Sequence, residues 1–399
     1  KKSQFNPSNS TVPLSRLDRR NVPKSTFSWN CNGLKRMMEA GDVNDFYKLL
    51  LKLDPDVAGL QEVKLLSDAS DPTLVKKGTL DEELFQSFID PLKETYNVYL
   101  SLTLPEHTSS KDKRYAGQLL LVKKDLPVPK LSYNFRSNKQ VYNNSNHYPH
   151  GRFIRADWGT DCSIMSVYAP FNGNGQEAHL ERRRRWDGHL LMELSELNLD
   201  NTPRILMGDL NCCLKDLDLT HDPKFWMSRQ GSTIPSDIAD RGFGGTTANE
   251  RMRMDVTLTH ADMFDTSDIF PCQQPANFSV NFKKGIFKGK GMKLDYILSD
   301  STILASGGVK SSYVVRGNGK EAHYMGSDHL PVSMVLDDQW LQKREFHVAN
   351  NVVEKAKSIQ DLIQETSTPE QQEELQGLDR PVPPELWSLL QRSQGELYY

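Results

Sequence analysis

The amino-acid sequence predicts an α/β fold in which packed sheets are flanked by helices. Short apolar, β-favouring segments recur along most of the chain. Segments with helical periodicity separate some of them, whereas others follow one another directly, and this mixture is typical of packed sheets with helices outside. The 399 residues suffice for one large core, and we expect a single folded domain over residues 27–337.

The first expected elements alternate between strand and helix. Residues 26–29 are a short apolar run that predicts a strand. Residues 42–53 place apolar side chains at helical spacing, and Asp54-Pro55 stops that helix. Residues 57–60 form another apolar run, which predicts a buried strand.

The later elements follow the same logic. Helical periodicity predicts one helix over residues 80–94 and the longest helix over residues 176–198. Short apolar runs predict further strands at residues 96–100, 117–122, 164–168 and 204–207.

The two ends of the chain differ from this pattern. Residues 1–26 carry six basic residues against one acid, Asp18, and predict an extended basic arm. A transit-peptide remnant and a nucleic-acid-binding arm also fit this composition. Residues 338–399 are rich in Gln and Glu and predict a charged helical tail that packs on the domain or binds a protein partner.

Composition excludes several classes of protein. A hydrophobic content of 37% and a charged content of 25% fit a globular domain, and no stretch has the roughly 18 apolar residues of a membrane span. The net charge of −3 means that any attraction to nucleic acid comes from local patches. Five cysteines without a CxxC pair argue against a disulfide framework and a cysteine-based zinc site. We therefore expect an intracellular, reducing compartment, and the nucleus, the mitochondrion and other organelles all remain open.

Polar residues stand where the predicted strands end or begin. Glu62 follows one strand, Asp209 and Asn211 follow another, and Asp295 opens a third. Each of these alone is compatible with an ordinary turn. Together, carboxylates and amides at one edge of packed sheets predict a site for a hard cation such as Mg²⁺.

Seven ordered motifs carry a family resemblance. They are Ser28-Trp29-Asn30-Cys31-Asn32-Gly33-Leu34, Leu60-Gln61-Glu62-Val63-Lys64, Tyr115-Ala116-Gly117, Tyr168-Ala169-Pro170, Gly208-Asp209-Leu210-Asn211, Leu294-Asp295-Tyr296 and Gly326-Ser327-Asp328-His329. Over about residues 27–335 the chain resembles the exonuclease III class of apurinic/apyrimidinic endonucleases, within the endonuclease/exonuclease/phosphatase superfamily. Arg184-Arg185-Trp186-Asp187 resembles the long-helix motif of that class.

The resemblance implies a DNase I-like, four-layer αββα sandwich that hydrolyses phosphodiesters. It implies that Glu62, with Asn32 or Asp328, holds Mg²⁺ or Mn²⁺. The implied catalytic residues are Asp209, which would orient or deprotonate water, His329 paired with Asp295, which would donate to a phosphate oxygen, and Asn211 and Tyr168, which would contact phosphate or bound water.

The expected contacts with DNA rest on local charge and on polar loops. A basic loop over residues 283–293 predicts a segment that follows a phosphate backbone, although a solvated surface loop fits as well. The full expected set is Asn30, Lys64, Arg152, Asn172, Asn174, Lys283, Lys284, Lys288, Lys290 and Lys293. The arginines over residues 182–185 fit either another contact or a helix face in water.

The expected specificity pocket departs from the family. The class holds a base-less sugar between aromatic walls, whereas Val280 and Met292 stand near those positions here, followed by Leu294. The sequence therefore supports phosphodiester hydrolysis better than selectivity for abasic sites.

The favoured function is apurinic/apyrimidinic endonuclease activity on DNA in base-excision repair, with 3′-exonuclease or 3′-phosphodiesterase activity as an addition. Another nuclease of the superfamily, such as a tyrosyl-DNA phosphodiesterase or an RNA exonuclease, is an alternative. A non-catalytic nucleic-acid-binding subunit of a larger complex is a third interpretation.

Overall fold

The structure is a computed structural model of the 399-residue chain. It describes residues 22–108, 113–138, 147–199, 202–229, 231, 233–270, 278–282, 285–305, 307–316, 324–338 and 341. The expected arm lies almost wholly outside the described residues, as does the tail beyond residue 341.

Two mixed sheets of six strands form the centre of the molecule. The first has the order β13-β14-β1-β2-β4-β3 and contains β1 (Ser25–Asn30), β2 (Val57–Gln61), β3 (Tyr96–Ser101), β4 (Gln118–Lys123), β13 (Val309–Val314) and β14 (Val332–Leu336). The second has the order β5-β6-β7-β8-β12-β9 and contains β5 (Lys130–Ser132), β6 (Phe153–Trp158), β7 (Cys162–Tyr168), β8 (Arg204–Asp209), β9 (Met263–Asp265) and β12 (Asp295–Asp300). A separate hairpin pairs β10 (Val280–Asn281) with β11 (Gly291–Met292).

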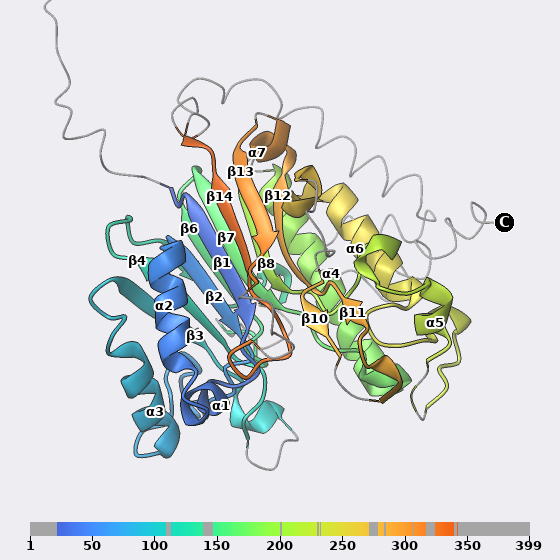
Figure 1. The fold of residues 1–399 in the computed structure, drawn as a ribbon, viewed down its shortest axis with the longest axis horizontal. Coiled ribbons are helices and arrows are strands. Elements are labelled where there is room, and N and C mark those ends of the chain that lie inside the picture. The colour runs from blue at the N-terminus through green and yellow to red at the C-terminus, as the bar shows by residue number, and fades with distance from the viewer. Residues whose placement is uncertain are drawn as a thin grey trace, which may run out of the picture.

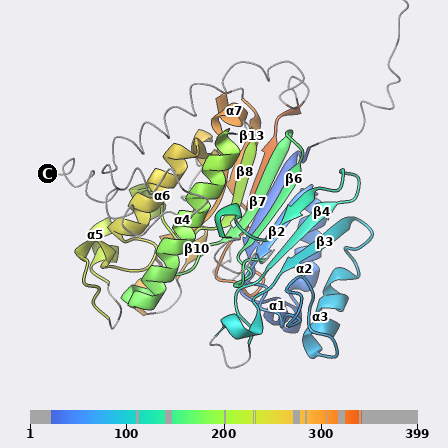
Figure 2. The same cartoon turned by 180° about the vertical axis from the view of Figure 1, so that it is seen from behind.

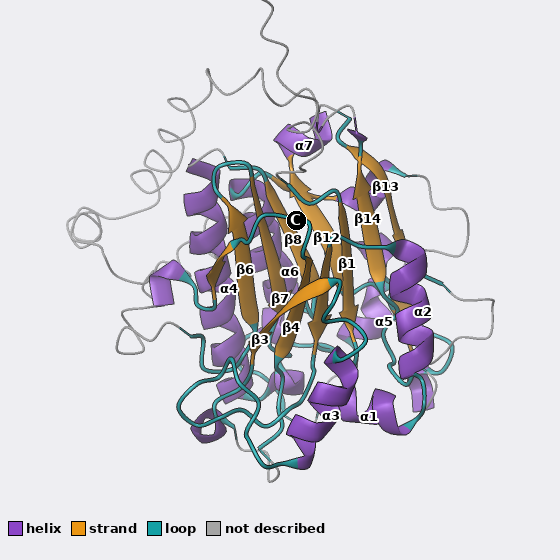
Figure 3. Ribbon diagram, turned by 90° about the vertical axis from the view of Figure 1, so that its left-hand side faces the viewer, coloured by secondary structure: helices purple, strands orange, loops and turns teal. Residues whose placement is uncertain are grey.

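Helices cover the outer faces of both sheets (Figures 1 and 3). Those on the first sheet are α1 (Leu34–Glu39), α2 (Val43–Leu53) and α3 (Leu80–Ile89). Those on the second are α4 (Glu177–Leu199) and α6 (Ala248–His260), which lie side by side in Figure 2. Two short helices complete the set: α7 (Ser301–Ala305) lies at the top of Figure 1 beside β13, and α5 (Pro223–Met227) lies at its right-hand side beyond β11.

Alternation along the strands explains why there are four layers. In β4, Leu121 packs toward the α1–α3 layer and Leu120 packs between the two sheets. In β8, Met207 packs between the sheets and Leu206 packs toward α4 and α6. Because successive side chains of a strand point to opposite faces, a strand that is buried throughout needs a packing partner on each side. The predicted αββα sandwich is confirmed.

A small polar layer crosses between the sheets next to their shared edge. Gln61 of β2 donates to Ser28 of β1 (3.1 Å) and to Ser166 of β7 (3.2 Å), and Ser166 donates to Gln118 of β4 (2.7 Å). All four side chains are buried, so these hydrogen bonds replace water that the groups lose on folding. The layer joins the two sheets directly behind the residues of the site.

Most predicted elements are found at the expected places. The helix expected over residues 80–94 is wrong at its end, because α3 ends at Ile89 and Pro91 removes the N–H that a continuing helix needs. In the described part of the chain, no helix is both long and apolar enough to cross a bilayer.

Candidate active site

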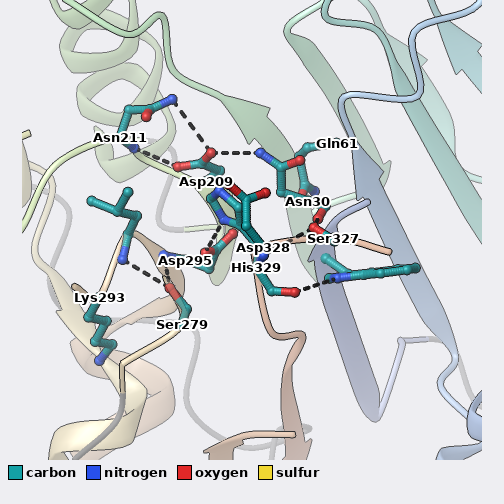
Figure 4. A network of polar contacts seen from close by, with 12 residues as sticks. Asn30, Gln61, Asp209, Asn211, Ser279, Lys293, Asp295, Ser327, Asp328 and His329 are labelled. Carbon is teal, nitrogen blue, oxygen red and sulfur yellow. Dashed lines mark hydrogen bonds and ion pairs between the residues drawn. The ribbon is translucent and has the colours of Figure 1, made fainter. Parts of the chain in front are cut away.

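The pairing of the strands brings their polar ends to one edge. β1 runs parallel to β2, and β7 runs parallel to β8 with Tyr168 opposite Asp209. β12 runs antiparallel to β8, so it begins where β8 ends, with Asp295 opposite Asp209. His329 lies just before β14, which is antiparallel to β1. The site residues predicted from scattered motifs therefore lie at a single edge (Figure 4).

Asn30 connects the carboxylates of the two sheets. Its side-chain amide donates to Asp209 Oδ2 (2.9 Å) and to Glu62 Oε1 (3.0 Å). The Tyr168 hydroxyl donates to the same Glu62 oxygen (2.5 Å). The two amide hydrogens of Asn30 thus connect Asp209, the expected base on the second sheet, to Glu62, the expected metal ligand on the first.

Asp209 is held by backbone geometry as well. Its Oδ1 accepts from the backbone N–H of Asn211 (2.8 Å), and the Asn211 side chain donates to the carbonyl of Ala169 (2.8 Å). Gly208 must be glycine, because a Cβ there would lie 1.9 Å from the carbonyl oxygen of Val167. The Gly-Asp-x-Asn motif is therefore required by the close approach of β7 and β8.

Asp295 and His329 form a hydrogen-bonded pair across the sheets, with 2.8 Å between His329 Nδ1 and Asp295 Oδ2. This contact places a proton on Nδ1 and turns Nε2 away from Asp295. Asp295 is fully buried, and its Oδ1 has no hydrogen-bond partner among the described residues.

Two buried serines hold this pair and were absent from the predicted site. Ser279 Oγ accepts from the backbone N–H groups of Leu294 and Asp295 (both 3.0 Å). Ser327 Oγ donates to the carbonyl of Asn30 (2.6 Å) and accepts from the N–H of His329 (3.1 Å). Ser327 could have been found from its place in the Gly-Ser-Asp-His motif, whereas no sequence signal marks Ser279.

Several of these residues adopt an uncommon backbone conformation. The φ angles are +52° at Asn32, +56° at Glu62, +51° at Lys64 and +45° at Asn211. Residues other than glycine pay roughly 1–3 kcal/mol for strained backbone conformations, which tend to cluster at functional sites. The strain here coincides with the predicted site.

The residues predicted to hold a metal form a cluster of hard oxygen donors. The Lys64 ammonium lies 2.6 Å from Glu62 Oε2 and 2.7 Å from Asn32 Oδ1, and the Asn32 amide donates to Asp328 Oδ1 (2.8 Å). The Lys64 ammonium between the Glu62 and Asn32 oxygens shows that this position favours positive charge. These oxygen donors fit a hard divalent cation such as Mg²⁺ or Mn²⁺.

A second group also has the geometry of a cation site. One ligand atom each from Asp209, Asp295 and His329 lie within 4.8 Å of one another. However, Asp209 is engaged by two asparagines and Asp295 by His329. The Glu62 carboxylate is engaged as well, by Asn30, Tyr168 and Lys64, so both groups have the donors for a cation.

The environments of the three titrating groups push their pKa values apart. Burial raises the pKa of Glu62, but the Lys64 ammonium and hydrogen bonds from Lys64, Tyr168 and Asn30 outweigh it and lower the value to about 2. Burial and the neighbouring Asp295 raise the pKa of Asp209 to about 7. Burial lowers the pKa of His329, but the Asp295 carboxylate outweighs it and raises the value to about 10. Near neutral pH the site therefore holds an ionised Glu62, an imidazolium and a carboxyl that can exchange its proton.

Four residues expected to contact DNA are buried: Asn30, which is held within the site, and three others whose predictions need correction. Arg152 is 1% exposed, and its guanidinium lies over the rings of Tyr115 and Tyr168, at 5.1 Å and 4.4 Å from their centroids. Lys293 is 3% exposed and is paired with Asp265. Asn172 is fully buried in the loop beside Gly244. Because each side chain packs inside the protein, none is free to follow a phosphate backbone.

The remaining expected DNA contacts have mixed outcomes. Lys288 is exposed, and the Lys290 ammonium lies 4.8 Å from the centroid of the Phe225 ring. Lys283 and Lys284 lie outside the described residues, as does the side chain of Asn174. Among the described lysines of this loop, Lys288 is therefore accessible to solvent.

The expected pocket residues are packed together. Val280 pairs with Met292 across the β10–β11 hairpin, and both belong with Leu294 to one buried apolar cluster. Met292 is fully buried and Val280 is 3% exposed. Both side chains pack within this cluster, and their role in lining a pocket stays a prediction.

Comparisons with known proteins agree with the architecture and the motifs. Residues 27–329 match the Endonuclease/Exonuclease/phosphatase family. A DNA-(apurinic or apyrimidinic site) endonuclease of Arabidopsis thaliana is 28% identical over 352 residues, which cover 83% of this chain and 89% of that protein. An exodeoxyribonuclease of Bacillus subtilis is 24% identical over 311 residues, which cover 78% of this chain and 98% of that protein. A 3′ phosphatase from Neisseria, solved with a product DNA hairpin, has a similar fold, with a TM-score of 0.55, 18% identity and coverage of 79% of this chain and 99% of that one. These findings confirm the predicted resemblance.

Proposed function

Because the chain belongs to the Endonuclease/Exonuclease/phosphatase family, we propose that it is a divalent-metal-dependent nuclease that hydrolyses phosphodiesters in DNA. The observation that carries this proposal is the continuous set of hydrogen bonds from Glu62 through Asn30 to Asp209, beside the Asp295–His329 pair. The relatives support DNA as the substrate, because those named act on apurinic or apyrimidinic sites or on DNA ends. We place the activity in base-excision repair, with incision at abasic sites as the main reaction and 3′-end processing as an addition.

Asp209 has the contacts expected of a general base. The Asn30 and Asn211 amides fix its carboxylate, and its raised pKa makes it basic enough to take a proton near neutral pH. In this role Asp209 orients a water molecule and accepts its proton as the water attacks phosphorus.

His329 supplies positive charge to the reacting phosphate. As an imidazolium it donates from Nε2 to a non-bridging oxygen, while Asp295 holds the opposite ring nitrogen. Tyr168 donates to Glu62 in this structure, and in this proposal its hydroxyl hydrogen-bonds phosphate or the leaving oxygen during the reaction.

Glu62, with Asn32 or Asp328, would hold Mg²⁺ or Mn²⁺. When bound, such an ion offsets the charge that develops on the phosphate oxygens. Lys64 balances the Glu62 carboxylate in this structure, and in this proposal it also contacts a phosphate.

The setting of the enzyme is also a proposal. Four described cysteines, Cys31, Cys162, Cys212 and Cys213, are buried free thiols, which supports an intracellular, reducing compartment, either the nucleus or an organelle. We propose that residues 338–399 bind a protein partner. Of the arm expected over residues 1–26, Ser25 and Thr26 belong to β1, so the proposed arm is confined to the residues before them.

A cleavage panel tests the function. The full chain is incubated with an abasic duplex, a duplex with a blocked 3′ end and a poly(A) strand, each with Mg²⁺, Mn²⁺ or EDTA. We expect metal-dependent cleavage of the abasic or 3′-blocked duplex, which is lost in Asp209→Asn and kept in the exposed control Asp161→Asn.

Other outcomes would change the conclusion. Faster cleavage of poly(A) than of either duplex would make the enzyme an RNA nuclease. Cleavage that persists in EDTA, or no cleavage of any strand, would refute the proposal.

A further inference from the structure

Four consecutive arginines on α4 have very different surroundings. Arg185 is exposed, with 68% of its side-chain surface accessible, and Arg184 has 26% accessible. Arg183 has 0% accessible, although a guanidinium is expensive to bury. Such a charge needs specific partners within the protein.

The Arg183 guanidinium binds the two loops that follow β7 and β8. Its Nη1 donates to the carbonyls of Pro170 and Asn211 (both 3.1 Å), and its Nη2 donates to the carbonyl of Leu210 (3.0 Å). Pro170 follows Tyr168 by two residues, and Leu210 follows Asp209 directly. One side chain therefore joins the backbone segments that carry Tyr168 and Asp209.

The charge of Arg183 is balanced within the same buried cluster. Its Nε donates to Asp187 Oδ1 (2.8 Å), and Asp187 Oδ2 accepts from Arg253 Nε of α6 (2.9 Å). Glu250 Oε1 lies 3.9 Å from Arg183 Nη1. Two cations and two anions thus make a neutral cluster, and only Arg183 reaches the loops through the hydrogen bonds described.

We propose that Arg183 is a positioning residue that sets the spacing between Tyr168 and Asp209 at the active site. The expected effect on kcat rests on the proposed nuclease function. An arginine is required because its planar fork presents N–H groups in separate directions to three carbonyls and a carboxylate, whereas lysine has a single nitrogen. The long helix then contributes to catalysis through Arg183, which is held by Asp187, the last residue of the Arg184-Arg185-Trp186-Asp187 motif.

The test compares Arg183→Lys with two matched variants. Arg253→Lys changes an equally buried arginine of the same cluster that binds Asp187 but none of the three carbonyls. Arg185→Lys changes an exposed arginine of the same helix. We expect Arg183→Lys to lower kcat roughly 10- to 100-fold with little change in KM, because a small misplacement of catalytic groups carries a cost of that size. Both control variants should keep wild-type kcat.

A spectroscopic measurement tests the spacing without cleavage. The protein is labelled with 3-fluorotyrosine, and the ¹⁹F resonance of Tyr168 is assigned by its loss in Tyr168→Phe. We expect this resonance to shift or broaden in Arg183→Lys and to stay unchanged in Arg253→Lys. If Arg183→Lys does not fold, Arg183→Met combined with Asp187→Asn removes one charge of each sign and serves in its place.

The outcomes separate this proposal from the proposed function. A fall in kcat and a moved Tyr168 resonance that are confined to the Arg183 variants would support it. Equal kcat values and an unmoved resonance in Arg183→Lys and Arg253→Lys would overturn it. A wild-type protein that cleaves no strand would refute the proposed nuclease, and the Tyr168 resonance would then decide the role of Arg183 alone.

Discussion

Replacing Ser279 with alanine would remove the acceptor for two backbone N–H groups beside the catalytic pair. These groups belong to Leu294 and Asp295, and both lie 3.0 Å from Ser279 Oγ. Ser279 is fully buried, so water would not readily replace the lost hydroxyl. Its carbonyl would still accept from the N–H of Leu330 (2.7 Å), which keeps the chain path in place.

The magnitude follows from the two unpaired donors. Leaving one buried donor without a partner costs about 1–3 kcal/mol, and partial relaxation reduces the sum for two neighbours. We expect the free energy of unfolding to fall by about 2–4 kcal/mol in Ser279→Ala. Because Asp295 orients His329, kcat should also fall by about tenfold.

Ser299→Ala is the matched control. Ser299 lies in β12 with Asp295 and is fully buried, yet its hydroxyl has no hydrogen-bond partner among the described residues. We expect its free energy of unfolding to stay within about 0.5 kcal/mol of wild type. Urea unfolding and hydrogen exchange at the Asp295 amide measure the difference. Equal unfolding free energies and equal exchange rates in the two variants would refute the role of Ser279.

Three further predictions concern the chemistry of the site. The pKa of Asp209 is raised to about 7, so its basic form is lost as pH falls through that value. Single-turnover rates should therefore drop about tenfold per pH unit below 7. A rate that is flat from pH 5.5 to 8.5 would exclude Asp209 as the base. His329→Ala should lower kcat by about 10²–10⁴-fold, whereas the exposed control His221→Ala should be neutral, and equal rates in both would remove His329 from the mechanism. Lys64→Met removes the ammonium that lies between Glu62 and Asn32. In an EPR titration without DNA, Mn²⁺ should then bind roughly tenfold more tightly. Weaker binding would contradict the proposed metal position.

Local patterns in the sequence predicted packed sheets flanked by helices, and the resemblance carried by the seven motifs implied the four layers and the site residues. Runs that are buried on both faces, such as residues 204–207, mark central strands whatever surrounds them. Glu62 and Asp209 each follow such a run, in different sheets, and the contacts of Asn30 bring them together.

The wrong predictions concern side chains whose packing partners are distant in the sequence. Arg152 has the composition of a phosphate contact, but Tyr115 and Tyr168 enclose it. Lys293 belongs to a basic run, yet Asp265 neutralises it within the fold. Ser279 gains its role from partners that follow it by 15 and 16 residues and gives no local sign of it. A single sequence cannot distinguish such buried polar groups from surface groups.

Three hydrogen bonds of the site connect one sheet to the other: Asn30 to Asp209, Tyr168 to Glu62 and His329 to Asp295. Neither sheet by itself holds all the groups of the site, so the site exists only where the two sheets meet. Any sliding of the two sheets would break all three bonds together, while each sheet could keep its own ladder of hydrogen bonds. Catalytic activity should therefore depend on the contact between the two sheets. On heating, activity should be lost at a lower temperature than the β-strand signal in circular dichroism.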